Sequence, residues 1–203
     1  KKRKAKKINI IVGYKSRLIK RYLKKIENLD FKFIKIKNFK SNGHAYSWYS
    51  FKNEWFKNMK PLLILHTDIL FSPQYLDNIL NSKKKNIIGV KWRKNHKLKK
   101  DSYIVKSDKN SKILSIDRLK NNKNFYGEVI GINKISSRTS RNIFNYMKIF
   151  FNKKTKKYSW EKFLNYYIKD TSEKFHLMKK QNYFWVNINT MNDYLVAKKY
   201  KLN

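Results

Sequence analysis

Short apolar runs alternate with amphipathic segments along most of the chain. The runs Ile8–Gly13 and Leu62–Leu65 are largely apolar, which is typical of strands buried on both faces. Residues 15–27 instead repeat apolar side chains every three or four positions, which predicts a helix with one apolar face. The same two patterns predict strands at 31–36, 86–92 and 126–133, two short strands within 175–188, and helices at 45–59, 138–151, 159–169 and from about Thr190 onward.

Two local signals add to this pattern. Ser72 followed by Pro73 predicts the start of a helix, because serine favours the N-cap and proline the first helical position. The polar stretch 93–125 contains strand-like pieces at 102–106 and 112–117 around a turn, which predicts a hairpin. Strands and helices therefore alternate, and we expect an α/β layered fold with a mainly parallel sheet. Such sheets bind ligands at the carboxyl ends of their strands.

The composition changes this picture mainly through its charge. The 203 residues include 50 Lys and Arg against 13 Asp and Glu, a formal net charge of +37, which suggests a nucleic-acid partner. A second explanation is an AT-rich genome, because Lys, Asn, Ile, Tyr and Phe have AT-rich codons and supply 116 of the 203 residues. The chain has no Cys, which excludes a disulfide framework and makes a zinc site improbable. No apolar run approaches the roughly 18 residues of a membrane span, so we expect a cytoplasmic protein.

The few acidic residues can be considered one by one. Asp68 follows an apolar strand and precedes the helix start at Ser72, so its carboxylate is expected at the ligand-binding edge of the sheet. Such an oxygen suits Mg²⁺, which takes only one or two protein ligands and keeps waters and phosphate oxygens. The alternative is a turn residue that bonds its own backbone.

Each of the other candidate polar residues also has a plain structural alternative. Glu128 lies inside a predicted strand and faces either solvent or a site, and Glu161 begins a helix, where the helix dipole favours a carboxylate. Asp193 is spaced from Thr190 as in a capping box. Asn189 closes a strand, where asparagine commonly forms turns.

Five segments, in order, resemble nucleotidyltransferases that activate small phosphorylated molecules. The segments are INIIVGYKSRLIKRYL, SNGHAYSW, LLILHTDILFSPQYLDNIL, FYGEVIGINKIS and YFWVNINTMNDYLVAKKY. They are similar to segments of sugar-phosphate nucleotidyltransferases, of phosphocholine or aminoethylphosphonate cytidylyltransferases, and of MobA-like NTP transferases. The resemblance covers nearly the whole chain. It implies an α/β fold built as a three-layer, Rossmann-like (GT-A-like), mainly parallel sheet with helices on both faces. It also implies a single domain over residues 1–203, with residues 1–7 as a basic leader.

The resemblance also implies roles for individual residues. Asp68 and Asn189 would hold Mg²⁺, with Asn189 standing where many relatives have Asp, and Lys91 would meet a phosphate as a second catalytic residue. The nucleotide would be bound by Ser41, Asn42, Gly43 and His44. The acceptor would be bound by Glu128, Trp160, Glu161 and Trp185, although tryptophans are more often core residues.

The implied reaction transfers a nucleoside monophosphate from a nucleoside triphosphate, with CTP favoured, to a small phosphorylated or phosphonate acceptor. A phosphocholine-like molecule or a sugar phosphate would be the acceptor, and pyrophosphate would leave. Relatives begin with a further strand and a Gly-rich loop, which this sequence lacks, so an N-terminally truncated domain is expected. Two alternatives stay open: a basic RNA- or DNA-binding domain, and a catalytically inactive relative that acts as an interaction module. The oligomeric state is not indicated.

Overall fold

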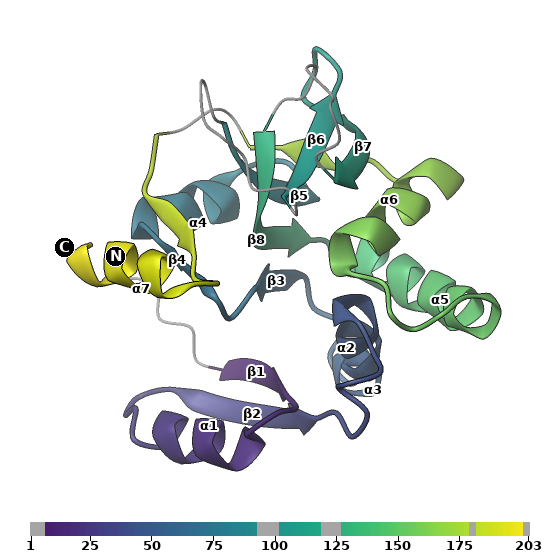
Figure 1. Cartoon of the computed structure of the whole chain (residues 1–203). Helices are drawn as coiled ribbons and strands as arrows, with labels where there is room; N and C mark the ends of the chain where they lie inside the picture. Colours follow the sequence, from purple (N-terminus) through teal and green to yellow (C-terminus); the bar gives the residue numbers. More distant parts are fainter. Residues whose placement is uncertain (1–6, 93–101, 119–126, 179–181, 201–203) are drawn as a thin grey trace. The chain divides into compact units, whose positions relative to one another are not determined.

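A computed structural model describes residues 7–92, 102–118, 127–178 and 182–200. These residues form two compact units (Figure 1). Unit 1 contains Lys1–Met59 and Phe144–Phe163, and unit 2 contains Lys60–Ile143 and Leu164–Asn203. Residues 1–6 of the basic leader lie outside the described part, and the single domain over 1–203 stays a prediction.

Unit 1 begins with two parallel strands joined by a helix. Strand β1 (Lys7–Val12) pairs along its whole length with β2 (Asp30–Lys35), and α1 (Ser16–Leu23) lies between them in sequence. Parallel strands need a crossover connection, and the amphipathic segment that follows β1 supplies it. The two strands and the helix lie where the apolar pattern predicts them.

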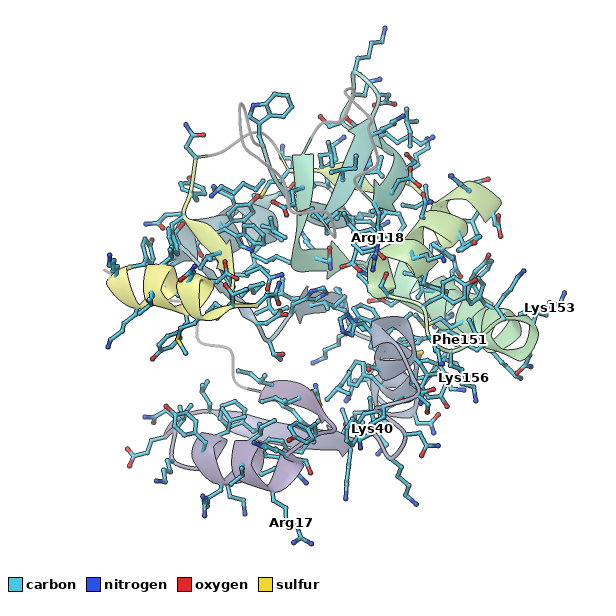
Figure 2. The ribbon with its side chains drawn as sticks, in the orientation of Figure 1. Arg17, Lys40, Arg118, Phe151, Lys153 and Lys156 are labelled. Atoms are coloured by element: carbon cyan, nitrogen blue, oxygen red, sulfur yellow. The ribbon has the colours of Figure 1, made fainter. Side chains whose placement is uncertain are left out.

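An aromatic cluster forms the core of unit 1. Helices α2 (His44–Ser50) and α3 (Lys52–Phe56) replace the one helix expected at 45–59, because the chain turns at Phe51. The Trp48 and Trp160 rings stack with their centres 4.2 Å apart. Phe151, which is labelled in Figure 2, packs edge-on against Tyr46. Phe150 and Phe151 near the end of α5 (Ser137–Lys153) and Phe163 near the start of α6 (Trp160–Asp170) pack in the same cluster. Each of these two helices begins in one unit and ends in the other.

Unit 2 is built on a six-stranded sheet. The strand order is β7-β6-β8-β5-β9, with β3 paired to β8 off this path. The strands are β3 (Leu62–Leu65), β5 (Ile87–Lys91), β6 (Tyr103–Ser107), β7 (Ile113–Arg118), β8 (Gly127–Ile135) and β9 (His176–Leu177). Helix α4 (Pro73–Asn81) packs through Tyr75 and Ile79 against Ile130 and Ile132 of β8, and this contact is the centre of the unit's core.

The expected α/β, Rossmann-like fold class is confirmed, but the strand directions are mixed rather than mainly parallel. Among the described residues only β1–β2 and β5–β9 pair in parallel, whereas β8 runs antiparallel to β3, β5 and β6. Strands β6 and β7 form the expected hairpin, and a connection this short allows only antiparallel pairing. Apolar runs show where strands lie but not which way neighbouring strands point, so the mixture was not visible in the sequence.

A smaller ladder in unit 2 joins two distant segments. Strand β4 (Ile69–Phe71) pairs antiparallel with β10 (Trp185–Asn187), and α7 (Met191–Lys199) follows β10 (Figure 1). Ser72 and Pro73 begin α4 as expected, although the Ser72 side chain makes no capping hydrogen bond. In the described part of the chain, no helix combines the length and the apolar character needed to cross a bilayer.

Candidate active site

Asp68 and Asn189 come together through the β4–β10 ladder. Asp68 lies in the turn between β3 and β4, and Ile69, the first residue of β4, pairs with Asn187, the last residue of β10. The ladder continues one step further, because the Ile188 backbone N–H donates to the Asp68 carbonyl oxygen at 2.7 Å. Asn189 is the next residue along the chain, and both Asp68 and Asn189 are exposed. Two residues 121 positions apart in the sequence therefore occupy one corner of unit 2.

The helix cap behind Asn189 fixes its backbone. The Thr190 hydroxyl accepts from the Asp193 backbone N–H at 3.2 Å, and the Asp193 carboxylate accepts from the Thr190 N–H at 2.9 Å. The same carboxylate accepts from the Asn189 N–H at 3.1 Å. The capping-box interpretation of Asp193 is therefore confirmed. The Asn189 carboxamide takes no part in the cap.

The oxygen donors at this corner suit one hard cation. Within the described ranges, no three His, Asp or Glu side chains lie close enough to hold a metal ion by themselves. Mg²⁺ does not need such a group, because it binds through one or two protein oxygens and fills its remaining positions with water and substrate phosphate. The Asp68 carboxylate and the Asn189 side-chain carbonyl oxygen would be a donor set of that kind, and their role as metal ligands stays a prediction.

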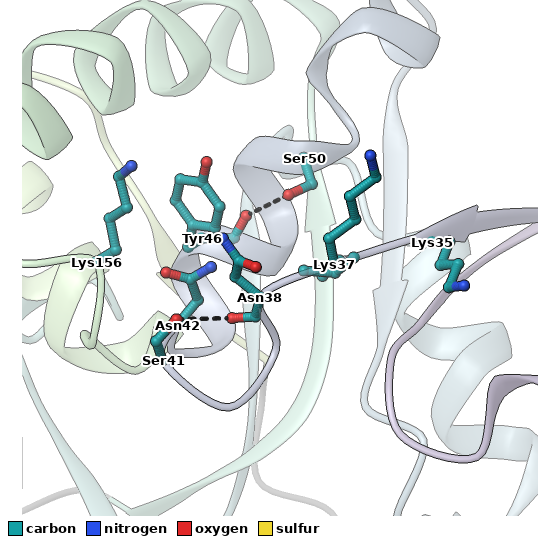
Figure 3. A pocket seen from close by; sticks show the side chains of 9 residues that line it. Lys35, Lys37, Asn38, Ser41, Asn42, Tyr46, Ser50 and Lys156 are labelled. Carbon is teal, nitrogen blue, oxygen red and sulfur yellow. Dashed lines mark hydrogen bonds between the residues drawn. The ribbon is translucent and has the colours of Figure 1, made fainter.

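Unit 1 contains a basic cavity of about 350 Å³ beside α2 (Figure 3). Its walls come from the end of β2, from the loop that follows, from α2 and from the loop between α5 and α6. The lining residues are Lys35, Ile36, Lys37, Asn38, Ser41, Asn42, Tyr46, Ser50 and Lys156. Three lysines and no acidic residue line the cavity, so its potential is positive and favours an anionic ligand. The Lys156 ammonium also lies 5.0 Å from the centre of the Tyr46 ring.

Only two of the four residues predicted to bind the nucleotide line this cavity. Ser41 and Asn42 line it, and the Ser41 hydroxyl donates to the Asn38 carbonyl at 3.1 Å. Gly43 and His44 are not among the lining residues. The Gly43 N–H donates to the Lys156 carbonyl at 2.8 Å, and a Cβ on Gly43 would lie 2.2 Å from the Tyr158 carbonyl oxygen. The close approach of these two backbones accounts for a glycine at this position.

Glu128 and Lys91 are cross-strand neighbours in the unit 2 sheet. Glu128 on β8 is paired with Lys91 on β5 and is only 8% exposed, which excludes the solvent-facing alternative. The Ser102 hydroxyl donates to one Glu128 carboxylate oxygen at 2.5 Å. Ser102 lies in a polar stretch without a motif, so no sequence signal singled it out.

The tryptophans expected at the acceptor site are core residues by their packing. Trp160 in unit 1 is buried against Trp48, and Glu161 beside it is buried as well. Trp185 in unit 2 is buried in the cluster around Tyr75, and its indole N–H donates to the Ile130 carbonyl at 3.1 Å. Core packing accounts for both tryptophans, and a role in acceptor binding stays a prediction.

Similar proteins are found by comparing structures but not by comparing sequences. No family model matches the sequence, and a search of curated proteins finds no match either. The fold is similar to the inositol-1-phosphate CTP transferase from T. maritima, at 18% identity and a TM-score of 0.76 over 95% of this chain and 75% of that one. It is also similar to the CTP:phosphocholine cytidylyltransferase from Streptococcus pneumoniae, at 14% identity and a TM-score of 0.68 over 95% and 77%. A UDP-glucose pyrophosphorylase in complex with UDP-glucose matches at 14% identity and a TM-score of 0.69 over 95% and 79%.

The chain has the nucleotidyltransferase fold. The resemblance carried by the five sequence motifs is confirmed at the level of the fold, since these three similar structures are nucleotidyltransferases of different specificities. A nucleotidyltransferase fold by itself fixes neither the base nor the acceptor.

The cavity residues that lie outside the five motifs were not predicted from the sequence as binding residues. Lys35 lies near the end of the strand predicted at 31–36, and Lys37 and Asn38 follow it. That position is the one signal that could have drawn attention to them. Lys156 had no signal at all, because it is one of 43 lysines and reaches the cavity from a loop more than 100 residues away.

Proposed function

We propose that the protein is a Mg²⁺-dependent nucleotidyltransferase. It transfers a nucleoside monophosphate from a nucleoside triphosphate to a small phosphorylated or phosphonate acceptor and releases pyrophosphate. The observation that carries the proposal is the meeting of Asp68 with Asn189 at one corner of a nucleotidyltransferase fold. The two residues lie far apart in the sequence, and nothing in the local structure of either segment requires them to meet.

In this proposal Asp68 and Asn189 hold the cation. Bound Mg²⁺ would withdraw charge from the α-phosphate and neutralise the incoming acceptor anion. Asp68 supplies the one full negative charge, and Asn189 supplies a neutral carbonyl oxygen. Because ligand charge raises cation affinity, this pair should bind Mg²⁺ more weakly than two aspartates would.

The cavity of unit 1 is the proposed nucleotide site. Ser41 and Asn42 line it together with Asn38, so hydroxyl and amide groups are available to read the edge of a base. The lysines of the cavity supply positive charge for phosphate oxygens. Lys91 at the end of β5 is proposed separately as a residue that contacts a phosphate. CTP is the favoured nucleotide, and two of the structural neighbours are named for reactions with CTP.

The chemistry requires little covalent work from the protein. An oxygen of the acceptor's phosphate attacks the α-phosphorus, the bond from that phosphorus to the bridging oxygen breaks, and the electron pair leaves with pyrophosphate. Positioning and charge neutralisation dominate such transfers. Residues of each unit are proposed separately as acceptor contacts: Glu128 and Trp185 in unit 2, and Trp160 and Glu161 in unit 1. A carboxylate near an aromatic ring would suit a cationic head group such as choline.

The test measures pyrophosphate release from each of the four nucleoside triphosphates, with a panel of phosphorylated acceptors and Mg²⁺, on the natural full-length protein. Asp68→Asn should reduce release at least 100-fold while the circular dichroism spectrum and melting temperature stay unchanged. Asp77→Asn is the matched control, because Asp77 is an exposed carboxylate on α4 in the same unit. Undiminished release from the Asp68→Asn protein would refute the metal role, and no release from any combination would refute the proposed reaction.

A further inference from the structure

Helix α1 presents a stripe of apolar side chains to solvent. Leu18 and Tyr22 are 48% and 72% exposed, and their spacing of four places them on one face of the helix. Tyr14 and Ile26 continue the same spacing on either side of the helix and are exposed as well. None of the residues of α1 is buried.

The side of α1 that is best covered is not its apolar side. Ser16, Lys20 and Leu23 are the half-buried residues of the helix, and the Lys20 ammonium lies 5.4 Å from the centre of the Phe33 ring on β2. A surface helix normally buries its apolar stripe and exposes its charges. In α1 a lysine lies over the sheet while Leu18 and Tyr22 face outward, so packing within unit 1 does not account for them.

Basic residues flank the exposed stripe. Arg17 and Arg21 are exposed and follow the same four-residue spacing one position before Leu18 and Tyr22. Figure 2 shows the Arg17 side chain extending away from α1 and from the β1–β2 ladder. No acidic residue precedes Glu27 in the sequence, whereas the segment from 15 to 25 carries Lys15, Arg17, Lys20, Arg21, Lys24 and Lys25.

We propose that this face of α1 docks the protein on an anionic lipid surface. A short amphipathic helix with clustered Lys and Arg lies in the membrane interface, where its apolar side chains enter the acyl boundary and its cations meet lipid phosphates. Tyrosine suits that depth, because its ring is apolar and its hydroxyl stays hydrated. Tyr14 and Tyr22 would anchor the helix, and Arg17 and Arg21 would contact head groups.

The apolar stripe favours a lipid surface over a nucleic acid. Phosphate backbones are neutralised by Lys and Arg alone, and charges spread over the whole chain would serve that purpose equally well. Exposed Leu18 adds nothing to such binding, whereas it adds apolar contact with a bilayer. Lipid binding by α1 is independent of the proposed nucleotidyl transfer, because none of the residues proposed for that reaction lies on α1.

The experiment is vesicle co-sedimentation with the full-length protein. Vesicles of phosphatidylcholine with one quarter phosphatidylglycerol are compared with pure phosphatidylcholine vesicles at about 0.15 M salt. Leu18→Gln with Tyr22→Gln removes the stripe and keeps every charge. Its matched control is Tyr194→Gln with Leu195→Gln, which removes the same two residue types from exposed positions on α7.

A second pair of variants separates charge at α1 from the charge of the whole protein. Arg17→Gln with Arg21→Gln removes two cations from α1, and Lys198→Gln with Lys199→Gln removes two exposed cations from α7. The melting temperature of each of the four variants is measured first, and lipid binding is compared among the variants that keep the wild-type value.

We expect binding only to the anionic vesicles, at least tenfold weaker for both α1 variants and unchanged within twofold for both α7 variants. No binding by the wild type would overturn the proposal, as would equal losses in the α1 and α7 variants. Unchanged binding after loss of the stripe would also overturn it. A last result would overturn the proposal: the wild type binds an RNA oligonucleotide more tightly than it binds the anionic vesicles, and the Leu18→Gln, Tyr22→Gln variant binds that RNA equally well. The basic surface would then serve nucleic acid.

Discussion

Gly43 is the residue at which a structural role and a ligand-binding role can be separated most sharply. An alanine there would place its Cβ 2.2 Å from the Tyr158 carbonyl oxygen and 2.7 Å from the carbonyl carbon of Lys157. Both contacts are with backbone, so the loop around 157 must move away. That movement breaks the hydrogen bonds from Gly43 N–H to the Lys156 carbonyl (2.8 Å) and from Ala45 N–H to the Tyr158 carbonyl (3.2 Å).

The expected loss follows from those two bonds. At about 1 kcal/mol for each backbone hydrogen bond, Gly43→Ala should lower the free energy of unfolding by about 2 kcal/mol. With a urea dependence of about 2 kcal/mol per molar, the unfolding midpoint should fall by about 1 M. The fluorescence of the stacked Trp48–Trp160 pair reports on this unit.

Asn42→Ala is the matched control for Gly43→Ala. Asn42 lines the cavity beside Gly43, so its truncation should leave the midpoint within about 0.3 M of the wild type but weaken nucleotide binding. The reasoning would be refuted if Gly43→Ala kept the wild-type midpoint and lost nucleotide binding, because Gly43 would then contact the ligand itself.

Three further predictions concern unit 2. Burial lowers the pKa of His176, with the charge of Lys84 as a further cause, so the stability that neutral His176 contributes is complete above about pH 6.5 and is lost as the pH falls below that value. His176→Gln should therefore flatten the melting temperature between pH 7 and pH 5, and an unchanged pH dependence would contradict this. Trp185→Phe removes the indole hydrogen bond to Ile130 and should cost about 1 kcal/mol, or about 3 °C in melting temperature, whereas a change in acceptor KM at unchanged stability would indicate acceptor binding. Asn189→Asp adds a charge to the proposed metal ligands and should lower the Mg²⁺ concentration for half-maximal pyrophosphate release, and a higher requirement would argue against metal binding there.

Much of the fold could be predicted because apolar periodicity is a local property. The strand at Leu62–Leu65 and the helix that begins at Pro73 follow from neighbouring residues alone. Strand β4 was missed, because Ile69–Phe71 is too short to show a pattern and is a strand only through its pairing with β10. The division between α2 and α3 at Phe51 also lacked a local breaker such as Gly or Pro.

The candidate site was predictable only where a motif marked it. Asp68 stood out because an acid shortly after an apolar run is unusual in a chain with 13 acidic residues. The expected burial of that run was wrong, since Leu63 and Leu65 are exposed. The proximity of Asp68 to Asn189 depends on the β4–β10 ladder, which no local pattern reveals. Lys156 and Ser102 take their positions from tertiary contacts alone, so the sequence offered no reason to choose them.

The most direct test of the central claim is mass spectrometry of the reaction product. The natural full-length protein is incubated with Mg²⁺, a nucleoside triphosphate and a phosphorylated acceptor, and the nucleotidylated acceptor is quantified together with pyrophosphate. We predict a product that joins one nucleoside monophosphate to the acceptor's phosphate, formed in a one-to-one ratio with pyrophosphate and lost in Asp68→Asn. Nucleotide breakdown without that product, or the same yield from the Asp68→Asn protein, would contradict the account.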